Sequence, residues 1–456
     1  MKAMPTLPDI SSQPRSHHRN RQPNLFPSEA LASSERRRSS VGEFPRCAAL
    51  SLDANWKRAN KAPGGPLAVV DMFSGCGGMS AGFKSVNGIE PAYTIAGAID
   101  IDEVANRTYE ANLGIRPEKA DVSELARRPA LMSELFARYV GKNYDNLVLI
   151  GCAPCQGFSS HRNEAGEADP RNTLVVDFAR IAARIKPVAI VMENVPELLT
   201  DRYWPLVSQT RRILENAGYF VNLSVHNMAE VGAPQERFRT LMLAMKKPFM
   251  APHGFLSRSE FRTVRHAIGW LPPVAPGQRH PSDPMHYTAG HKPSTIATIQ
   301  AVPKDGGSRP DHVGPDCLRR AKARNGRAVY EDVYGRLFWD KPAITITAYA
   351  RNPASGRYVH PEQDRGLSVR EAALLQSFPA DYYFTGTLDE RFRQVGNAVP
   401  PAFAAFIAAH VVAQLRQTTP ASSFDKGITS PVGPSFSRLI PALKAGHRKG
   451  FCDSNE

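Results

Sequence analysis

The chain has 456 residues, of which 42% are hydrophobic, and it carries a formal net charge of +14 at pH 7. This length exceeds what one hydrophobic core usually serves, and it predicts two folded domains with tails. No apolar run reaches the roughly 18 residues of a membrane span, no signal peptide is evident, and the six cysteines do not suggest a disulfide framework, so we expect a cytoplasmic protein outside membranes.

The positive charge is distributed unevenly along the chain. Residues 1–64 carry a net +6 and are rich in Pro, Ser and Arg, which predicts a disordered basic tail, and 417–456 are expected to form a second disordered tail. Residues 65–245 carry a net −3, whereas 246–364 carry +8. Basic side chains concentrated in one segment can neutralise the phosphates of a nucleic acid. A merely solvated basic surface is the alternative.

The first predicted strand, 67–72, runs into a glycine-rich loop, Gly75-Cys76-Gly77-Gly78. Such a loop allows the backbone to approach a bound ligand. A dinucleotide fingerprint would require glycine where Ser80 stands, so the loop favours a ligand without a pyrophosphate.

Two aspartates follow the second predicted strand, 93–100. Asp100 ends this strand, where a carboxylate can accept hydrogen bonds from the two hydroxyls of a ribose. Asp121 precedes a short helical stretch, so it can bind a ligand or cap the helix, and both interpretations stay open.

The third predicted strand, 146–150, leads to Pro154 and Cys155. A cysteine in a loop at a strand end can be partly exposed and can ionise, as a nucleophile must. Cys152 and Cys155 could instead form a redox dithiol or half of a zinc site. The other cysteines offer no second close pair, so no metal is expected. The polar segment 155–172 is predicted to be a mobile loop.

The rest of the first half alternates between helical and strand patterns. A helix is predicted over 173–185 and a strand over 188–192, which ends at Glu193. Two late strands follow at 219–225 and 239–245, and a last helix is expected at 402–415. This alternation predicts a doubly wound α/β sheet that binds ligands at the carboxyl ends of its strands.

Six sequence blocks, in order along 65–416, resemble those of the DNA cytosine-5 methyltransferases, in particular bacterial type II modification methylases. Together they are far more specific than any one of them alone. They are Asp71-Met72-Phe73-Ser74-Gly75-Cys76-Gly77-Gly78, Pro154-Cys155-Gln156, Glu193-Asn194-Val195, Gln235-Glu236-Arg237-Phe238-Arg239, Arg370-Glu371-Ala372-Ala373-Leu374-Leu375-Gln376-Ser377-Phe378-Pro379 and Gln394-Val395-Gly396-Asn397-Ala398-Val399-Pro400.

The resemblance implies a Rossmann-like, S-adenosylmethionine-dependent methyltransferase sheet with helices on both faces, plus a smaller target-recognition domain. Residues 65–245 would form the catalytic and cofactor-binding domain, 246–364 the target-recognition domain, and 365–416 the C-terminal part of the catalytic domain. The two late strands would form an antiparallel hairpin.

The resemblance also implies a role for particular residues. Cys155 would add to carbon 6 of a flipped-out cytosine, so that carbon 5 can take a methyl group. Glu193 would act at ring nitrogen 3, Arg239 would contact the carbonyl oxygen of the base and Arg237 would help to hold the site. Residues expected at the cofactor are Phe73, Gly75, Gly77, Asp100, Ile101, Asp121, Val122, Pro154, Asn397 and Ala398.

The partners implied are double-stranded DNA and S-adenosylmethionine. A cognate restriction endonuclease would act on the same DNA site without direct contact, and the enzyme would be a monomer. Two alternatives stay open: an RNA cytosine methyltransferase on the same fold, and a DNA-binding homologue without activity. The intact Cys155 and Glu193 disfavour the second, and the long segment 246–364 disfavours the first.

Overall fold

The structure is a computed structural model that describes residues 66–86, 92–141, 144–154, 170–320, 332–417 and 421–438, together with Ile440 and Leu443. These residues all belong to one compact unit, Arg46–Glu456. The expected N-terminal tail, 1–64, lies outside the described residues. So do Cys155 and most of the loop predicted after it.

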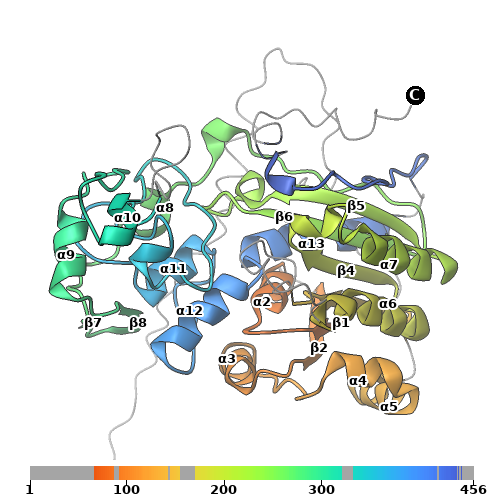
Figure 1. Cartoon of the computed structure of the whole chain (residues 1–456). Helices are drawn as coiled ribbons and strands as arrows, with labels where there is room; N and C mark the ends of the chain where they lie inside the picture. The colour runs from red at the N-terminus through yellow and green to blue at the C-terminus, as the bar shows by residue number, and fades with distance from the viewer. Residues whose placement is uncertain are drawn as a thin grey trace, which may run out of the picture. The chain divides into compact units, whose positions relative to one another are not determined.

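A six-stranded sheet with the order β2-β1-β3-β4-β6-β5 forms the centre of the fold (Figure 1). β1 pairs in parallel with β2 and β3, and β3 with β4, whereas β6 is antiparallel to both β4 and β5. The predicted α/β sheet and its late antiparallel hairpin are therefore confirmed. The strands are β1 (Leu67–Met72), β2 (Tyr93–Ile99), β3 (Leu147–Gly151), β4 (Ala189–Asn194), β5 (Phe220–Asn227) and β6 (Phe238–Met245).

Helices cover both faces of this sheet, because alternate residues of a strand point to opposite sides. Val70 of β1 packs in one apolar cluster with α4 to α7, and Val69 packs in another with α2 and α13. Gly82 of α2 lies so close to α13 that an added Cβ would stand 2.4 Å from Ala404 Cβ. The helices around the sheet are α2 (Gly78–Ser85), α3 (Glu103–Leu113), α4 (Val122–Arg127), α5 (Pro129–Val140), α6 (Leu174–Ile185), α7 (Trp204–Asn216) and α13 (Pro401–Arg416), with the 3-10 turns η3 (Pro170–Thr173), η4 (Pro196–Leu199) and η5 (Met228–Val231).

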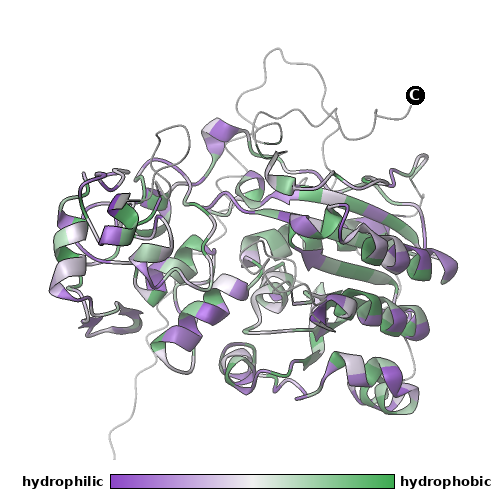
Figure 2. Ribbon diagram, in the orientation of Figure 1, coloured by the Kyte–Doolittle hydropathy of each residue, from purple (hydrophilic) through white to green (hydrophobic). Residues whose placement is uncertain are grey.

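Hydrophobic periodicity explains why α6 lies where it does. Phe178, Ile181 and Ile185 follow at helical spacing and are all buried, while Leu174 at the start of the same face is half-buried. The helix ends at Lys186, which adopts a left-handed conformation with φ 56°, and Pro187 cannot continue it. The strands of the sheet are mainly hydrophobic in Figure 2, while the helices around them are coloured in patches of both kinds.

The segment after β6 has short elements and a separate apolar core. That core combines Val264, Met285 and Ile346 with Leu375 and Phe392, so the expected boundary at residue 364 falls within a shared core. The region's elements are η6 (Arg258–Glu260), α8 (Val264–Ile268), β7 (Arg279–His280), β8 (Asp283–Tyr287), α9 (Pro293–Gln300), α10 (Asp316–Arg320), η7 (Pro353–Ser355), α11 (Val369–Leu375) and α12 (Leu388–Asn397).

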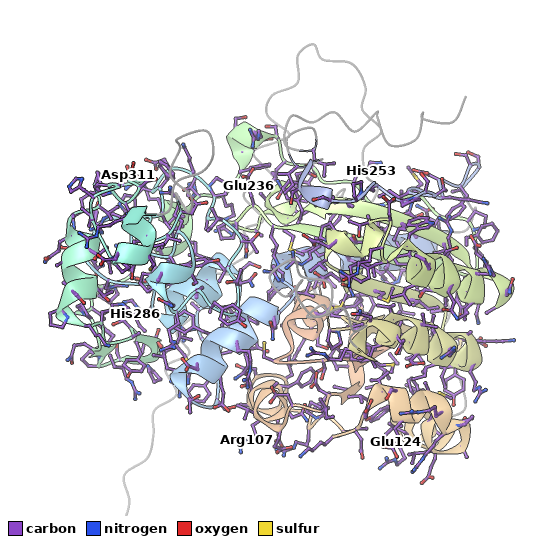
Figure 3. All side chains as sticks on the ribbon, viewed as in Figure 1. Arg107, Glu124, Glu236, His253, His286 and Asp311 are labelled. Atoms are coloured by element: carbon purple, nitrogen blue, oxygen red, sulfur yellow. The ribbon has the colours of Figure 1, made fainter. Side chains whose placement is uncertain are left out.

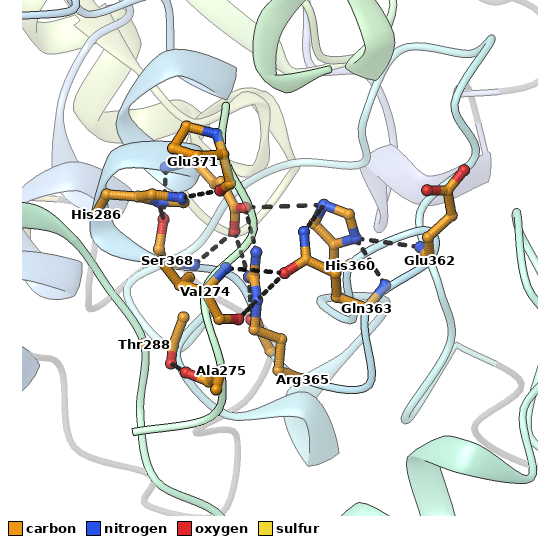
Figure 4. Close-up of polar contacts among 12 residues, drawn as sticks. Val274, Ala275, His286, Thr288, His360, Glu362, Gln363, Arg365, Ser368 and Glu371 are labelled. Atoms are coloured by element: carbon orange, nitrogen blue, oxygen red, sulfur yellow. Dashed lines mark hydrogen bonds and ion pairs between the residues drawn. The ribbon is translucent and has the colours of Figure 1, made fainter. Parts of the chain in front are cut away.

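A buried ion pair holds this boundary together (Figure 4). The Arg365 guanidinium donates to both oxygens of Glu371 at 2.7 Å, and its Nε donates to the Val274 carbonyl at 2.9 Å. Ser368 Oγ lies 2.8 Å from Nδ1 of His286. Because a bidentate pair with satisfied neighbours is costly to break, 365–371 is firmly joined to the chain around 274–286.

Residues 421–438 run beside β5 and are called here the C-terminal strap. Leu223 N donates to Lys426 O at 3.2 Å, and Ile428 N donates to Leu223 O at 2.8 Å. The prediction of a disordered tail over 417–456 is therefore wrong for these residues. Buried Ile428 and Phe436 explain the difference, since each inserts an isolated apolar side chain into the fold. The strap ends in η8 (Phe436–Arg438).

One stretch in the described part of the chain, Leu388–Arg416, is long and apolar enough to cross a membrane by length and composition. It consists of α12 and α13, which meet at the pair Pro400-Pro401. Phe403 and Ile407 of α13 are fully buried against α2 and the sheet. The apolar character of this stretch is thus explained by its place in the core.

Candidate active site

The loop after β1 has an unusual backbone. Phe73 and Gly75 have positive φ angles of 58° and 52°, and Gly77 has 89°. A non-glycine residue in this conformation costs on the order of 1 kcal/mol, and such strain gathers at ligand sites. An added Cβ at Gly75 would meet nothing within 4 Å, whereas at Gly77 it would stand 2.7 Å from Leu113. Gly75 therefore leaves open space for a ligand, and Gly77 serves close packing.

Asp100, just after β2, ties this loop in place. Its Oδ2 accepts from Gly75 N and its Oδ1 accepts from Asp102 N, both at 2.8 Å. Burial raises the pKa of Asp100, although these hydrogen bonds act in the opposite direction. A carboxylate has about four acceptor positions, so two remain for a ligand. Beside it, the Ile101 side chain is 63% exposed, which is unusual for isoleucine and leaves an apolar surface at the strand end.

The helix-cap interpretation of Asp121 is confirmed. Its Oδ1 accepts from Ser123 N at 2.8 Å at the start of α4. The residue is exposed, so the cap does not bury its carboxylate. Val122, however, is buried in the apolar cluster under α4, so its side chain serves packing.

A buried chain of hydroxyls supports the β1 loop, and sequence reasoning did not find it. Tyr109 OH donates to Ser80 Oγ at 2.7 Å, and Ser80 Oγ donates to Asp71 Oδ2 at 2.6 Å. Burial raises the pKa of Asp71 to about 7. These two hydrogen bonds join β1, α2 and α3 next to the loop. A carboxylate at the end of an apolar strand was the only signal in the sequence.

The segment that leads to Cys155 is fixed by the neighbouring strand. Asn194 Nδ2 donates to Ala153 O at 3.2 Å, and its Oδ1 accepts from Val195 N at 2.8 Å. Pro154 is the last described residue of this segment, so the predicted nucleophile itself lies outside the described residues. Asn194 of the Glu-Asn-Val block thus holds the backbone two residues before Cys155.

Cys152 is a poor nucleophile in this structure. Its Sγ lies 3.6 Å from Met79 Sδ, and burial raises the pKa of the thiol well above its usual range, with the Glu193 carboxylate adding to the shift. A thiol that stays protonated neither attacks nor binds zinc well. Among the described residues no group of three His, Cys, Asp or Glu is arranged to hold a metal ion.

Glu193 and Arg239 form the charged centre of the site. Arg239 Nε lies 3.0 Å from Glu193 Oε1, and both side chains are largely buried, with 13% and 8% exposed. They come from β4 and β6, where Glu193 pairs with Leu241, two residues beyond Arg239. The two predicted catalytic residues are therefore brought together.

Arg237 points elsewhere. It is buried and donates to the carbonyls of Ile346 at 2.9 Å and Gly396 at 3.1 Å. These bonds join β6 to the segments around 346 and 396, which agrees with the expected role of Arg237 in holding the site. The neighbouring Glu236 marks this junction in Figure 3.

Two buried glutamines extend the same junction. Gln235 Nε2 donates to Gln376 Oε1 at 2.6 Å, and Gln235 Oε1 accepts from Ile346 N at 3.1 Å. Gln376 Nε2 donates to Val395 O at 2.7 Å. Glutamines in two of the quoted blocks therefore connect β6, α11 and α12. Their pairing could not be read from one sequence.

Asn397 is exposed and is the last residue of α12 rather than the start of the last helix. The next residues pack closely on the glycine-rich loop. A Cβ added to Gly78 would stand 2.4 Å from Val399 O and 3.3 Å from Ala398 Cβ. The turn after α12 therefore packs against the first glycine loop, which brings Ala398 close to the residues expected at the cofactor.

The loops described here follow β1, β2, β3 and β4, so they meet at the carboxyl edge of the sheet, where α/β enzymes bind their ligands. This edge of the α/β sheet carries the glycine-rich loop tied to Asp100 and, beside it, the buried Glu193–Arg239 pair.

Comparison with known proteins names the class. Residues 67–413 match the family model of the C-5 cytosine-specific DNA methylases. The chain is 35% identical over 356 residues to the type II methylase M.HgiDII of Herpetosiphon aurantiacus, covering 75% of this chain and 94% of that protein. It is 32% identical over 351 residues to the type II methyltransferase M1.HphI of Haemophilus parahaemolyticus, covering 76% and 87%. The chain therefore belongs to the C-5 cytosine-specific DNA methylase family, and it is a DNA (cytosine-5) methyltransferase.

A solved structure, a putative DNA modification methyltransferase from an Escherichia coli prophage, is similar with a TM-score of 0.54. It covers 77% of this chain and 100% of its own, at 23% identity. This likeness supports the fold.

Proposed function

We propose that the protein transfers a methyl group from S-adenosylmethionine to carbon 5 of a flipped-out cytosine in a specific double-stranded DNA sequence, through a covalent adduct with Cys155. It would serve as the cytoplasmic, monomeric modification enzyme of a restriction-modification system. The cognate endonuclease would share the DNA site without touching the methylase.

The described residues fit S-adenosylmethionine. Gly75 faces open space, and Ser74 Oγ is buried without a hydrogen-bond partner in the described part of the chain. Asp100 would hold the ribose hydroxyls, and Phe73 and the exposed Ile101 would contact the adenine. When bound, this cofactor supplies the methyl group that carbon 5 takes.

The remaining chemistry belongs to side chains. Addition of the Cys155 thiolate to carbon 6 breaks the 5,6 double bond and moves its electrons to carbon 5, and later loss of the carbon 5 proton restores the double bond and expels the cysteine. Glu193 would supply a hydrogen bond or a proton at ring nitrogen 3, and Arg239 would bind the carbonyl oxygen.

Recognition would fall to the basic segment 246–364. Among the exposed aromatic side chains of the described residues are Trp270, at 60%, and Tyr349, at 73%. Exposed aromatic and basic side chains together suit contacts with bases and phosphates.

The observation that carries the proposal is the Asn194 to Ala153 bond, because it brings the segment before Cys155 to the strand end that bears Glu193. Methyl transfer from labelled S-adenosylmethionine should be measured on matched DNA and RNA. Transfer to DNA cytosine by the wild type and none by Cys155→Ser is the expected result. Transfer to RNA alone would favour the alternative, and no transfer to either would contradict the proposal.

A further inference from the structure

The C-terminal strap lies beyond residue 413, where the family match ends. It is a feature of this chain for which the family model does not account. Figure 1 shows it in dark blue beside β5, ending at a short turn near the start of β6. Its contacts form three groups along its length.

The first contacts are with the outer edge of β5. Besides the two backbone bonds to Leu223, Asn222 Nδ2 donates to Asp425 O at 2.9 Å. Gly427 has φ +65°, and an added Cβ would lie 2.1 Å from Leu223 O, so only glycine permits this approach.

The second group of contacts is made by a buried arginine of α7. Arg211 donates to the carbonyls of Ile428 at 3.0 Å and Lys426 at 3.4 Å. The same guanidinium donates to Val221 O of β5 at 3.2 Å. A buried charge needs such partners to offset its desolvation, so the strap completes the hydrogen bonding of Arg211.

The third group of contacts is made with η4 and with Phe238 at the start of β6. Val432 N donates to Leu199 O at 3.0 Å, and Asp201 N donates to Gly433 O at 3.2 Å, which fixes η4 and its end. Phe436 is 3% exposed, and its ring centroid lies 6.3 Å from that of Phe238.

These last contacts lie on the segments that follow Glu193 and precede Arg239 in the chain. η4 begins at Pro196, two residues after the end of β4. Phe238 immediately precedes Arg239 on β6. The strap therefore holds, from outside, both strand ends that carry the pair.

We propose that the C-terminal strap positions Glu193 and Arg239 for methyl transfer, with Phe436 as the positioning residue. The inference rests on the proposed function. Phe436 touches no reacting group and acts through Phe238 and η4. Its removal should lower the rate of the chemical step and leave substrate binding intact.

The test compares two aromatic anchors of the same strap. Phe436 is replaced by Leu, Val and Ala, and so is Phe424, whose ring lies 5.3 Å from Phe220 and 5.2 Å from Phe249, at the other end of the strap. For each variant kcat, the KM values for DNA and S-adenosylmethionine, and Tm are measured.

We expect Phe436→Ala to lower kcat about tenfold with both KM values within about twofold, the kind of loss that follows slight misplacement of catalytic groups. Phe436→Leu should restore most of kcat and Phe436→Val less. The Phe424 series should lower Tm and leave kcat unchanged. A chain ending at Arg438 should keep its kcat, and one ending at Gln417 should lose it.

Equal kcat in the two series, or a kcat loss that follows Tm in both, would overturn the inference. If Phe436→Ala does not fold, the Leu and Val pairs decide in the same way. An inactive wild type would contradict the proposed function itself. If the wild type is active and kcat does not change across the Phe436 variants, only the role of the strap is contradicted.

Discussion

The sheet region and the segment after it are held together by different means. The sheet is built of apolar strands, and helices cover both of its faces. On one face, Val69 of β1 and Phe403 of α13 belong to the same apolar cluster. The segment 246–364 has few regular elements, and several of its largest buried side chains are arginines. Arg336 is completely buried and donates to the carbonyls of Val302 and Ile299 at 3.0 and 2.9 Å.

Other arginines of this segment act in the same way. Arg357 donates to Gly306 O at 2.9 Å, and Arg309 donates to Val313 O at 2.7 Å. Guanidinium groups here replace the hydrogen bonds that strands and helices would supply. The net charge of +8 therefore overstates the positive surface available to phosphates, because part of it is internal. Net charge alone therefore does not identify which side chains of the proposed recognition segment, 246–364, would face DNA.

The largest effect is expected from replacing Cys155, which tests whether the catalytic nucleophile belongs to the sheet region. Cys155→Ser should abolish methyl transfer and leave DNA binding intact, because a hydroxyl is a far weaker nucleophile than a thiolate at neutral pH. Labelled-methyl transfer and a gel-shift titration measure the two properties. Cys152→Ala is the matched control and should keep substantial activity. Full activity of Cys155→Ser would end the covalent mechanism.

Exchange of the recognition segment separates the two regions more directly. Replacing 246–364 by the matching segment of a related methylase should change the methylated sequence, read by sequencing DNA from a methylation-free host. Because Arg365 and Glu371 belong to the same core, a chimera exchanged over 246–375 should be more stable than one cut at 364. Deletion of 1–60 should leave the target unchanged. An unaltered target in a folded chimera would place recognition elsewhere.

Removal of a buried arginine tests how the second region is held. Arg336→Met should lower the free energy of unfolding by on the order of 3–5 kcal/mol, since it leaves several buried carbonyls without their donor and Asp364 with only Lys304 as its cationic partner. Urea unfolding measures the loss. Arg265→Met, which removes the exposed pair with Asp340 and an exposed contact with the Trp339 ring, should change the free energy of unfolding much less. Similar curves for both variants would refute the role given to internal arginines.

A smaller effect is expected at the cofactor pocket. Asp100→Ala should weaken S-adenosylmethionine binding by on the order of 1–3 kcal/mol, because it removes ribose acceptors and frees the Gly75 loop. DNA affinity should not change. Asp121→Ala should weaken binding less, since Asp121 is an exposed helix cap. Calorimetry that finds full affinity in Asp100→Ala would remove this residue from the pocket.

A further prediction concerns the dependence of stability on pH. Burial lowers the pKa of His360 to about 4, and its Nδ1 accepts from the Glu362 and Gln363 amides at 3.1 and 3.0 Å. The unfolded chain binds the proton more readily, so this stability is present above about pH 6.5 and is lost as the pH falls towards 4, by at most about 1.4 kcal/mol per pH unit. His360→Gln should flatten the profile of unfolding free energy between these values. An unchanged slope would show that His360 does not titrate there.

The sequence predicted the sheet well because each strand is a short aliphatic run that is buried whatever its neighbours are. Glu193 and Arg239 were found through their blocks, and the structure brings them together. The buried side chains of Arg237 and Val122 show what a motif alone does not reveal, namely which way a side chain points.

Other features depend on partners far along the chain. Gln235 meets Gln376 across 141 positions, and the strap meets β5 across about two hundred. Their side chains carry no periodic signal. The buried arginines of 246–364 are also indistinguishable in sequence from solvated ones.

The packing of α13 on β1 has a consequence for the making of the protein. Tyr93 OH donates to the Ala408 carbonyl at 2.7 Å, and Val69 shares its core with Phe403, so the first strands translated need the last helix. Contacts of such long sequence separation form late, after the ribosome has released nearly the whole chain. A nascent chain therefore cannot complete the core of the sheet until residues 401–416 have been synthesised.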